Sequence, residues 1–218
     1  MEHTSAFWPI GLRVRDRRVV VVGGGMEAVR KVERLKPYGA RLLIVAGELH
    51  HLLGEAVGRG EAEWDPGPLM IRHVAHAACV IVCEPTSTEG RRALEVAGQA
   101  GVLVNAADAA HLSDFIAMAG FQRGPLEVAV HTSGASAALS RRLREHLSQL
   151  VTEEHGRLAD ILGGWRPTVR TALKSPDARR AFWLTVVDDA LLTRMETGSV
   201  GVEDVDQAIR LSLGEEER

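Results

Sequence analysis

The sequence predicts an α/β protein: a Rossmann-type, doubly wound parallel sheet, then a β-hairpin and helix region, then a small helical domain. Three observations predict this. A β-branched run, Arg18–Val22, leads into three glycines and directly into a helical pattern. Strand and helix patterns then alternate up to Asp108, which is typical of βαβ units with right-handed crossovers. After Asp108 two short strand patterns, joined by a turn, precede a helical remainder.

The first half of the chain opens with a complete βαβ unit. Residues 18–22 are expected to form a buried strand, because a β-branched run is bounded there by polar residues and glycine. A helix follows over 26–36, where Ala28, Val32 and Leu35 share one face, and Pro37 and Gly39 end it. The other elements expected in this half are strands at 40–47, 61–65, 79–84 and 101–107 and a helix at 87–100.

The second half changes character. Strands at 113–122 and 125–132 are joined by Arg123 and Gly124, and an amphipathic helix follows over 133–151, capped by Ser133 or Ser136. Everything after Thr152 has helical patterns. We therefore place domain boundaries after residues 112 and 150, which gives the segments 1–112, 113–150 and 151–218. The leucines expected to lie in line on the amphipathic helix are Leu139, Leu143, Leu147 and Leu150.

Composition narrows the class of protein. The chain has 218 residues and a formal net charge of −3, which argues against a dedicated nucleic-acid binder. No apolar run approaches the roughly 18 residues of a membrane span, and the first residues lack a signal-peptide pattern. Cys79 and Cys83 share one strand face about 13 Å apart, too far for a disulfide. We expect two buried thiols in a reducing, cytoplasmic compartment, and no membrane partner.

The glycine run is either an ordinary tight turn or a phosphate-binding turn. Gly23, Gly25 and Ala28 fit G-x-G-x-x-A, and the match follows a strand and opens a helix. In that context the first glycine permits the turn, the second lets a pyrophosphate approach, and the small third residue lets helix and strand pack closely. Helix N–H groups complete the anion site. The sequence therefore favours dinucleotide binding.

The choice between NAD and NADP stays open. An acidic residue often ends the second strand and binds the ribose hydroxyls. Here Ala46 and Gly47 stand at that place, and Glu48 is the nearest carboxylate, either a ribose ligand or a solvated loop charge. Because no arginine stands beside Glu48, the pattern leans toward NAD.

Several segments together resemble one family. "VVVVGGGMEAVRKVERLKPYGARLLIVA", "VNAADAAHLSDFIAMAG", "GPLEVAVHTSGASAALSRRLREHL" and "DARRAFW" occur in the order and spacing of the precorrin-2 dehydrogenase family, the amino-terminal module of siroheme synthases. The resemblance covers roughly residues 7 to 210. It implies NAD-dependent oxidation of precorrin-2 to sirohydrochlorin, and in some members ferrochelatase activity with ferrous or cobaltous ion as substrate. It also implies a homodimer, with 113–150 as the dimerisation region and 151–218 covering the site.

The resemblance assigns the site residues. Asp108 matches the family's acidic residue and follows a strand's carboxyl end, where it would act as general base; the alternative is a turn cap. Asn105 would contact cofactor or substrate. The cofactor contacts implied are Gly23, Gly25, Met26, Glu27, Ala28, Gly47, Glu48, Val82, Cys83 and Glu84.

Substrate contacts are expected in the third block. Thr132, Ser133, Gly134 and Ser136 open a helix, and either bind a carboxylate of the substrate, which carries eight, or cap the helix. Arg141 would bind another carboxylate, unless Arg141, Arg142 and Arg144 form a solvated helix face.

The histidines suggest no metal site. His131 replaces a small hydroxyl residue of the family and is either a functional imidazole or a strand histidine with a local partner. We expect the pair His50 and His51, and also His73 and His76, to be surface residues.

Two other classes of function are weighed against the enzyme. One is a non-catalytic, NAD-sensing regulatory domain, which would need no acid such as Asp108. The other is a dimeric protein that only holds a tetrapyrrole or a metal, which would need no glycine turn.

Overall fold

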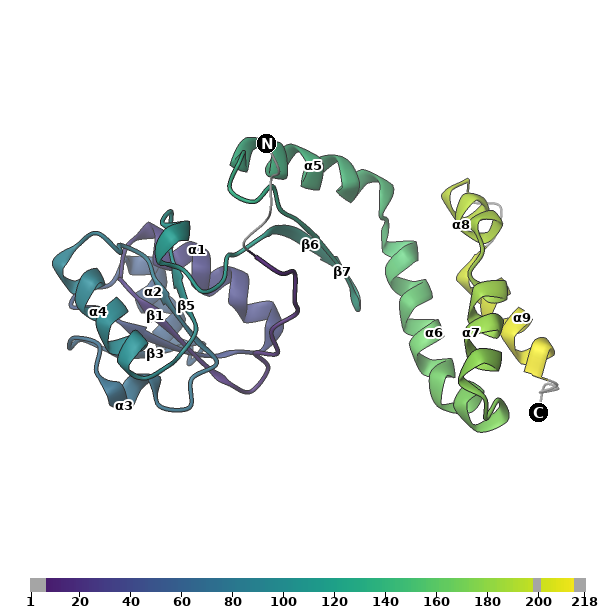
Figure 1. Cartoon of the computed structure of the whole chain (residues 1–218), viewed down its shortest axis with the longest axis horizontal. Helices are drawn as coiled ribbons and strands as arrows, with labels where there is room; N and C mark the ends of the chain where they lie inside the picture. The colour runs from purple at the N-terminus through teal and green to yellow at the C-terminus, as the bar shows by residue number, and fades with distance from the viewer. Residues whose placement is uncertain (1–6, 198–200, 214–218) are drawn as a thin grey trace. The chain divides into compact units, whose positions relative to one another are not determined.

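The computed structural model describes residues 7–197 and 201–213 and divides the chain into two compact units. The first unit ends at Ala117 and the second begins at Met118 (Figure 1). The division into three segments that the sequence suggests, at 112 and 150, stays a prediction.

The first unit is built on a parallel sheet of five strands in the order β3-β2-β1-β4-β5. The central strand β1 pairs with β2 on one side and β4 on the other, so the strand order reverses at β1 and β4. This confirms the doubly wound α/β fold that the sequence predicts. The strands are β1 (Arg18–Val22), β2 (Arg41–Val45), β3 (Glu63–Asp65), β4 (Cys79–Val82) and β5 (Val104–Ala106).

Helices cover both faces of this sheet (Figure 1). On one face Val19 and Val21 pack with residues of α1 and α2, and on the other Val20 and Val22 pack with residues of α3 and α4. Burial on both faces explains why β1 is a continuous valine run rather than an alternating one. The helices are α1 (Met26–Leu35), η1 (Lys36–Tyr38), α2 (His51–Gly58), α3 (Ile71–Val74), α4 (Thr88–Gln99) and η2 (Ala110–Leu112).

The segment after β5 differs from the expected strand over 113–122, because the strand begins only at Ala119. Ser113 and Asp114 instead bind the edge of β5: Val104 N–H donates to Asp114 Oδ2 (2.9 Å), and Ala106 N–H donates to Ser113 Oγ (2.9 Å). Their side chains take hydrogen bonds that an added strand would have taken.

The second unit begins with the antiparallel hairpin β6 (Ala119–Arg123) and β7 (Leu126–Val130). Gly124 has a φ of +52°, which confirms the expected turn between them. Helix α5 (Ala137–Leu150) packs against both strands, as does α6 (Glu153–Ala172). The chain ends with α7 (Pro176–Val186), α8 (Asp189–Glu196) and α9 (Val202–Leu213).

The helical part of this unit has its own core, made by Leu158, Trp165, Val169, Leu191, Val205 and Ile209. Helix α5 contributes little to any core: Leu139 is 49% exposed, Leu143 40% and Leu150 52%. Its leucines therefore form an apolar stripe on the surface of the unit. In the described part of the chain, no helix is both long and apolar enough to cross a membrane.

Candidate active site

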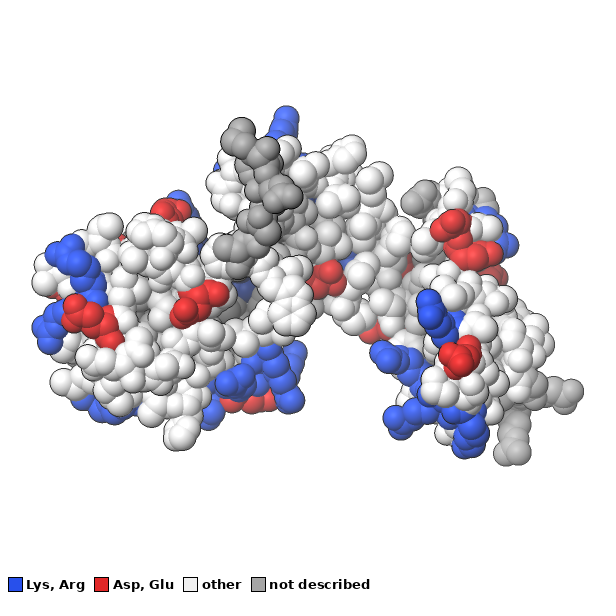
Figure 2. Space-filling model, in the orientation of Figure 1, with Lys and Arg blue, Asp and Glu red and all other residues white. Residues whose placement is uncertain are grey.

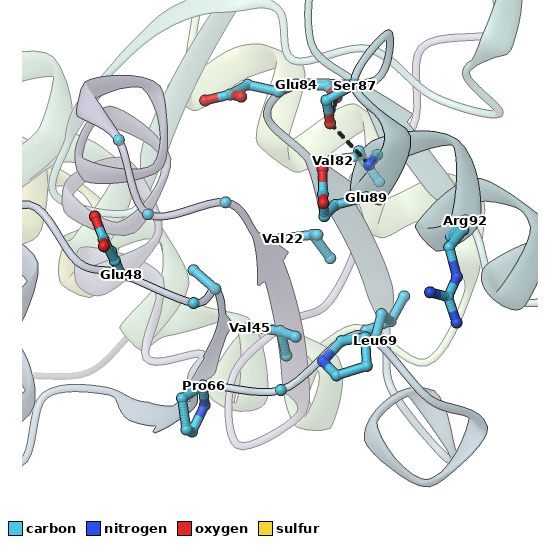
Figure 3. Close-up of a pocket in the computed structure, with 18 of the residues that line it drawn as sticks. Val22, Val45, Glu48, Pro66, Leu69, Val82, Glu84, Ser87, Glu89 and Arg92 are labelled. Atoms are coloured by element: carbon cyan, nitrogen blue, oxygen red, sulfur yellow. Dashed lines mark hydrogen bonds between the residues drawn. The ribbon is translucent and has the colours of Figure 1, made fainter.

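A pocket of about 680 Å³ opens at the carboxyl ends of three neighbouring strands in the first unit. Val45 of β2, Val22 of β1 and Val82 of β4 line its floor (Figure 3). This is the point at which the strand order reverses, where open α/β sheets bind their ligands.

The glycine turn forms one wall of the pocket, and each position in it is a glycine for a different physical reason. Gly23 has a φ of +121°, a backbone conformation that L side chains rarely adopt. A Cβ on Gly24 would lie 1.8 Å from the carbonyl oxygen of Glu48, whereas a Cβ on Gly25 would meet only Glu84 Oε1, at 3.7 Å. Gly24 is therefore packed against protein, while Gly25 leaves room for a ligand.

Helix α1 begins at this turn with Gly25 as its N-cap, and none of the described side chains caps it. The N–H groups of its first turn point out of the helix end without a side-chain acceptor. An uncapped N-terminus beside open space suits the pyrophosphate of a dinucleotide, so the residues present fit the cofactor that the sequence implies.

The loop after β2 is held from both sides. Trp64 Nε1 donates to the carbonyl oxygen of Ala46 (2.8 Å), and Ala46 N–H donates to the carbonyl oxygen of Asp65 (3.1 Å). On the other side His50 N–H donates to the carbonyl oxygen of Gly24 (2.7 Å). These contacts fix the backbone around Glu48, which lines the pocket beside the glycine turn (Figure 3).

A buried histidine fixes the segment 66–69, which lines the pocket (Figure 3). Met70 N–H donates to His73 Nδ1 (3.1 Å), so the neutral ring carries its proton on Nε2, which donates to Asp65 Oδ2 (3.0 Å). Gly67 N–H donates to Asp65 Oδ1 (2.7 Å). That bond, then the nearby His73 and Arg72, lower the pKa of Asp65 despite partial desolvation. The segment 66–69, which lines the pocket, is thus tied at both ends.

The remaining wall comes from the turn after β4 and from α4. Ser87 Oγ accepts from Gly90 N–H (2.9 Å) and caps the helix, as Figure 3 shows. Gly90 itself is packed tightly, since a Cβ there would lie 1.9 Å from the carbonyl oxygen of Glu84. Arg92 lines the pocket on the side away from Glu48 (Figure 3).

The cofactor residues expected from the sequence fall into two groups. Those that line the pocket are Gly23, Gly25, Gly47, Glu48, Val82 and Glu84, whereas Met26, Glu27, Ala28, Cys83 and Asn105 do not. Ala28 is fully buried between helix and sheet, and Cys83 lies behind the turn, 3.0 Å from a Cβ placed on Gly23. Burial raises the pKa of the Cys83 thiol to about 12. Both cysteines are buried free thiols, as expected.

Asp108 lies just beyond β5, next to the pocket strand β4. Ala107 N–H donates to the carbonyl oxygen of Val82 (2.9 Å), so Asp108 follows a residue bonded to the pocket floor. Asp108 is exposed and has a φ of +57°, uncommon outside glycine. Nearby, Asn105 Nδ2 donates to the carbonyl oxygen of Phe115 (3.0 Å), while its buried Oδ1 accepts no hydrogen bond from any described residue.

The substrate residues expected from the sequence belong to the second unit. Ser136 Oγ accepts from Leu139 N–H (3.1 Å) and caps α5, and Thr132 Oγ1 accepts from Ser136 N–H (3.1 Å). These two hydroxyls therefore hold the helix start. Ser133 and Gly134 are exposed with φ of +52° and +83°, and Arg141 is exposed on α5.

Among the histidines, the expectation of a surface position is wrong for His73, which is only 5% exposed. The burial of His73 was not predicted from the sequence, because its partner Asp65 is eight residues away, in a stretch without clear periodicity. His76 lies after the short helix α3, with a φ of +61°. His131 Nδ1 accepts from Ser133 N–H (3.3 Å), a local partner. Within the described ranges, no group of three or more His, Cys, Asp or Glu side chains is arranged to hold a metal ion.

Comparison with known proteins agrees with this geometry. A family model described as "Putative NAD(P)-binding" matches residues 10–119, half of the chain. The chain belongs to this NAD(P)-binding family. A second model, described as "Sirohaem synthase dimerisation region", matches residues 154–208, within the helical part of the second unit.

Relatives of this NAD(P)-binding protein include longer enzymes. It is 35% identical over 216 residues to the siroheme synthase of Chromobacterium violaceum, and the match covers 97% of this chain and 45% of that protein. It is 32% identical over 207 residues to the siroheme synthase of Nitrosococcus oceani, covering 95% and 44%. The chain thus spans about half the length of these relatives. The resemblance to the siroheme synthase family that the motifs indicate is confirmed.

A solved structure shares the fold. The protein titled "SirC, precorrin-2 dehydrogenase" matches with a TM-score of 0.72 over 94% of this chain and 99% of that one, at 22% identity. The match supports the arrangement of a Rossmann-type unit followed by a hairpin and helices.

Proposed function

We propose that the protein is an NAD-dependent dehydrogenase that oxidises precorrin-2 to sirohydrochlorin. The single observation that carries the proposal is the pairing of an uncapped glycine turn with Asp108 at the same sheet edge. The turn opens the pocket, and Asp108 follows the residue bonded to the pocket floor at Val82. Similarity to siroheme synthases over nearly the whole chain supports the choice of substrate.

The pocket would hold NAD, which supplies the hydride acceptor when bound. Backbone N–H groups of Met26 and Glu27, in the first turn of α1, would bind the pyrophosphate. Glu48 would accept hydrogen bonds from the adenosine ribose hydroxyls, and its negative charge would disfavour the 2′-phosphate of NADP.

Asp108 would take the proton. Loss of a hydride from the reduced macrocycle must be accompanied by loss of a proton, and a carboxylate is a suitable general base. The Asp108 side chain is exposed and makes no hydrogen bond or ion pair with the part of the chain described, so it is available to a substrate. Asn105 Oδ1, buried on β5 and without a donor among the described residues, would accept an N–H group only if the segment around it moves on binding.

The working state we propose is a homodimer in the cytoplasm. The exposed leucine stripe of α5 (Leu139, Leu143 and Leu150) gives an apolar surface that a second copy would cover. The match of 154–208 to a dimerisation region supports the same state. The free thiols of Cys79 and Cys83 suit a reducing compartment.

The test is direct. Precorrin-2 is generated in situ with NAD and the purified protein, and the sirohydrochlorin spectrum and NADH absorbance are followed together. We expect both to rise in step. Asp108→Asn should abolish the reaction while leaving the dissociation constant for NAD unchanged, whereas Glu95→Gln, an exposed carboxylate of α4, should react normally.

The outcomes separate the alternatives. NAD binding without oxidation would support a non-catalytic NAD-sensing domain and sink the dehydrogenase. Near-normal turnover by Asp108→Asn would remove the general-base assignment. Adding ferrous or cobaltous ion after oxidation tests for chelatase activity. Metal insertion no faster than the uncatalysed background would exclude that activity.

A further inference from the structure

A second pocket, of about 340 Å³, lies within the helical part of the second unit. It is formed where α6 gives way to α7, and Figure 2 shows Lys and Arg side chains gathered over this end of the helices. Arg166 and Arg170 stand one helical turn apart on α6, and Arg179 and Trp183 stand one turn apart on α7. The lining residues are Arg166, Pro167, Arg170, Arg179 and Trp183.

Basic side chains outnumber acidic ones in the segment that forms this pocket. Residues 161–187 include five basic side chains and one acidic side chain, Asp177. None of these basic side chains forms an ion pair with a residue in the described ranges, although ion pairs occur elsewhere on α6, such as Arg157 with Glu154 at 2.7 Å. Guanidinium groups gathered without carboxylates repel one another, so an anionic ligand would stabilise them.

One arginine is fixed in place. Arg179 Nη1 donates to the carbonyl oxygen of Leu173 (2.9 Å) and to that of Lys174 (2.6 Å). These bonds occupy one nitrogen of the guanidinium and leave its other donors for a ligand. They also tie α7 to the end of α6, which gives the pocket a defined shape.

The pocket also has an apolar wall. Trp183 is half-buried and meets Phe182 edge-on, with ring centroids 5.2 Å apart and an interplanar angle of 73°. Pro167, which follows Arg166 in α6, also lines the pocket. A small inorganic anion would use the arginines alone, whereas a flat ligand with carboxylates at its rim would use both the arginines and the indole.

We propose that this pocket, Arg166, Arg170, Arg179 and Trp183, binds peripheral carboxylates of the tetrapyrrole. The proposal rests on the proposed function and deepens it, because it assigns recognition of the substrate's carboxylates to the helical part. Guanidinium groups pair with carboxylates through two parallel hydrogen bonds, and an indole face packs against a flat ring.

The test uses stable porphyrins as probes. Uroporphyrin has eight carboxylates and coproporphyrin four, and their fluorescence reports binding to the full chain. We expect uroporphyrin to bind more tightly than coproporphyrin. The double variant Arg166→Gln with Arg170→Gln should weaken uroporphyrin binding about tenfold or more, the effect of losing charge-assisted hydrogen bonds. The control Arg157→Gln, a paired arginine on the same helix, should bind like the unaltered protein.

Three results would overturn the proposal: no binding of uroporphyrin, equal binding by the double variant, or complete displacement by citrate at concentrations comparable with the porphyrin. The last would indicate a general anion site. NAD binding, measured in parallel, reports folding of the first unit and should not change. Porphyrin binding that depends on the arginines, in a protein that fails to oxidise precorrin-2, would defeat the proposed function and leave this site standing.

Discussion

The carbonyl oxygen of Glu48 occupies the space in which a side chain on Gly24 would begin, since a Cβ there would lie 1.8 Å from it. His50 N–H donates to the carbonyl oxygen of Gly24 at 2.7 Å, so the glycine turn and the loop after β2 are locked together. The middle glycine of the run therefore joins the turn that we propose binds the pyrophosphate to the loop that we propose binds the ribose.

This contact predicts a clear difference between two neighbouring alanine variants. Gly24→Ala should destabilise the fold by about 2 kcal/mol or more, because the backbone must move to relieve overpacking. Gly25→Ala meets only Glu84 Oε1 at 3.7 Å, so it should keep near-normal stability but bind NAD at least tenfold more weakly. Urea unfolding and NAD titration of both variants check this. Equal stability of the two would contradict the packing argument.

The sequence predicted the sheet and the turn because both depend on local patterns. Valine runs, a helical period after Gly25 and a proline with glycine at the end of α1 are signals within a few residues of each other. The steric role of Gly24 was not predicted, since it depends on Glu48, 24 positions further on. The short helices α2 and α3 were also missed, because their stretch has no clear period.

The place of the pocket was predicted for the same reason, whereas the roles of its residues stay predictions. Glu48 and Val82 were expected at strand ends, and both line the pocket. The role of Asp108 comes from the resemblance and stays a prediction, since Asp108 does not line the pocket. Strand β3 and helix α3 contribute to the pocket through the contact between Asp65 and His73. No rule of residue spacing predicts that contact. Side chains such as Arg92, which reach the pocket from a helix already assigned to the core, gave no separate signal.

The hydrogen bond between His73 and Asp65 predicts a positioning role for this histidine. His73→Leu leaves Asp65 Oδ2 without its buried donor, and the segment 66–69 loses one of its anchors. We expect NAD to bind roughly fivefold more weakly, as for loss of one hydrogen bond, with a faster amide exchange confined to this segment. Isothermal titration and hydrogen exchange measure the two effects.

Arg72→Gln is the matched control for His73. Arg72 contacts the same carboxylate oxygen at 3.4 Å, but its side chain is 62% exposed. An exposed ion pair contributes little, so NAD affinity should stay within about twofold. Equal losses in both variants would mean that charge near Asp65 matters, rather than the buried hydrogen bond.

The burial of the two cysteines predicts that the folded protein reacts slowly with thiol reagents. Desolvation by burial raises the pKa of Cys79 to about 11 and that of Cys83 to about 12. At pH 8 both are protonated, and the thiolate is the reactive form. The native protein should therefore react slowly with a chromogenic disulfide, and both thiols should react at once in denaturant. Fast labelling of the native protein, abolished by Cys83→Ser, would contradict this prediction. It would show that the glycine turn at Gly23 moves readily and exposes Cys83.

Cofactor choice provides the last prediction, and it depends on Glu48. This carboxylate lines the pocket in the loop fixed by Trp64 and by Gly24. Glu48→Gln keeps the size of the side chain but removes its charge. Binding of NAD should weaken about threefold to tenfold, since hydrogen bonds to a charged group contribute more than neutral ones. Binding of NADP should strengthen, because repulsion of its phosphate is removed. The ratio of the two dissociation constants, measured by titration at fixed salt, reports the effect. If the ratio stays constant, Glu48 is a solvated loop charge and the ribose is held elsewhere.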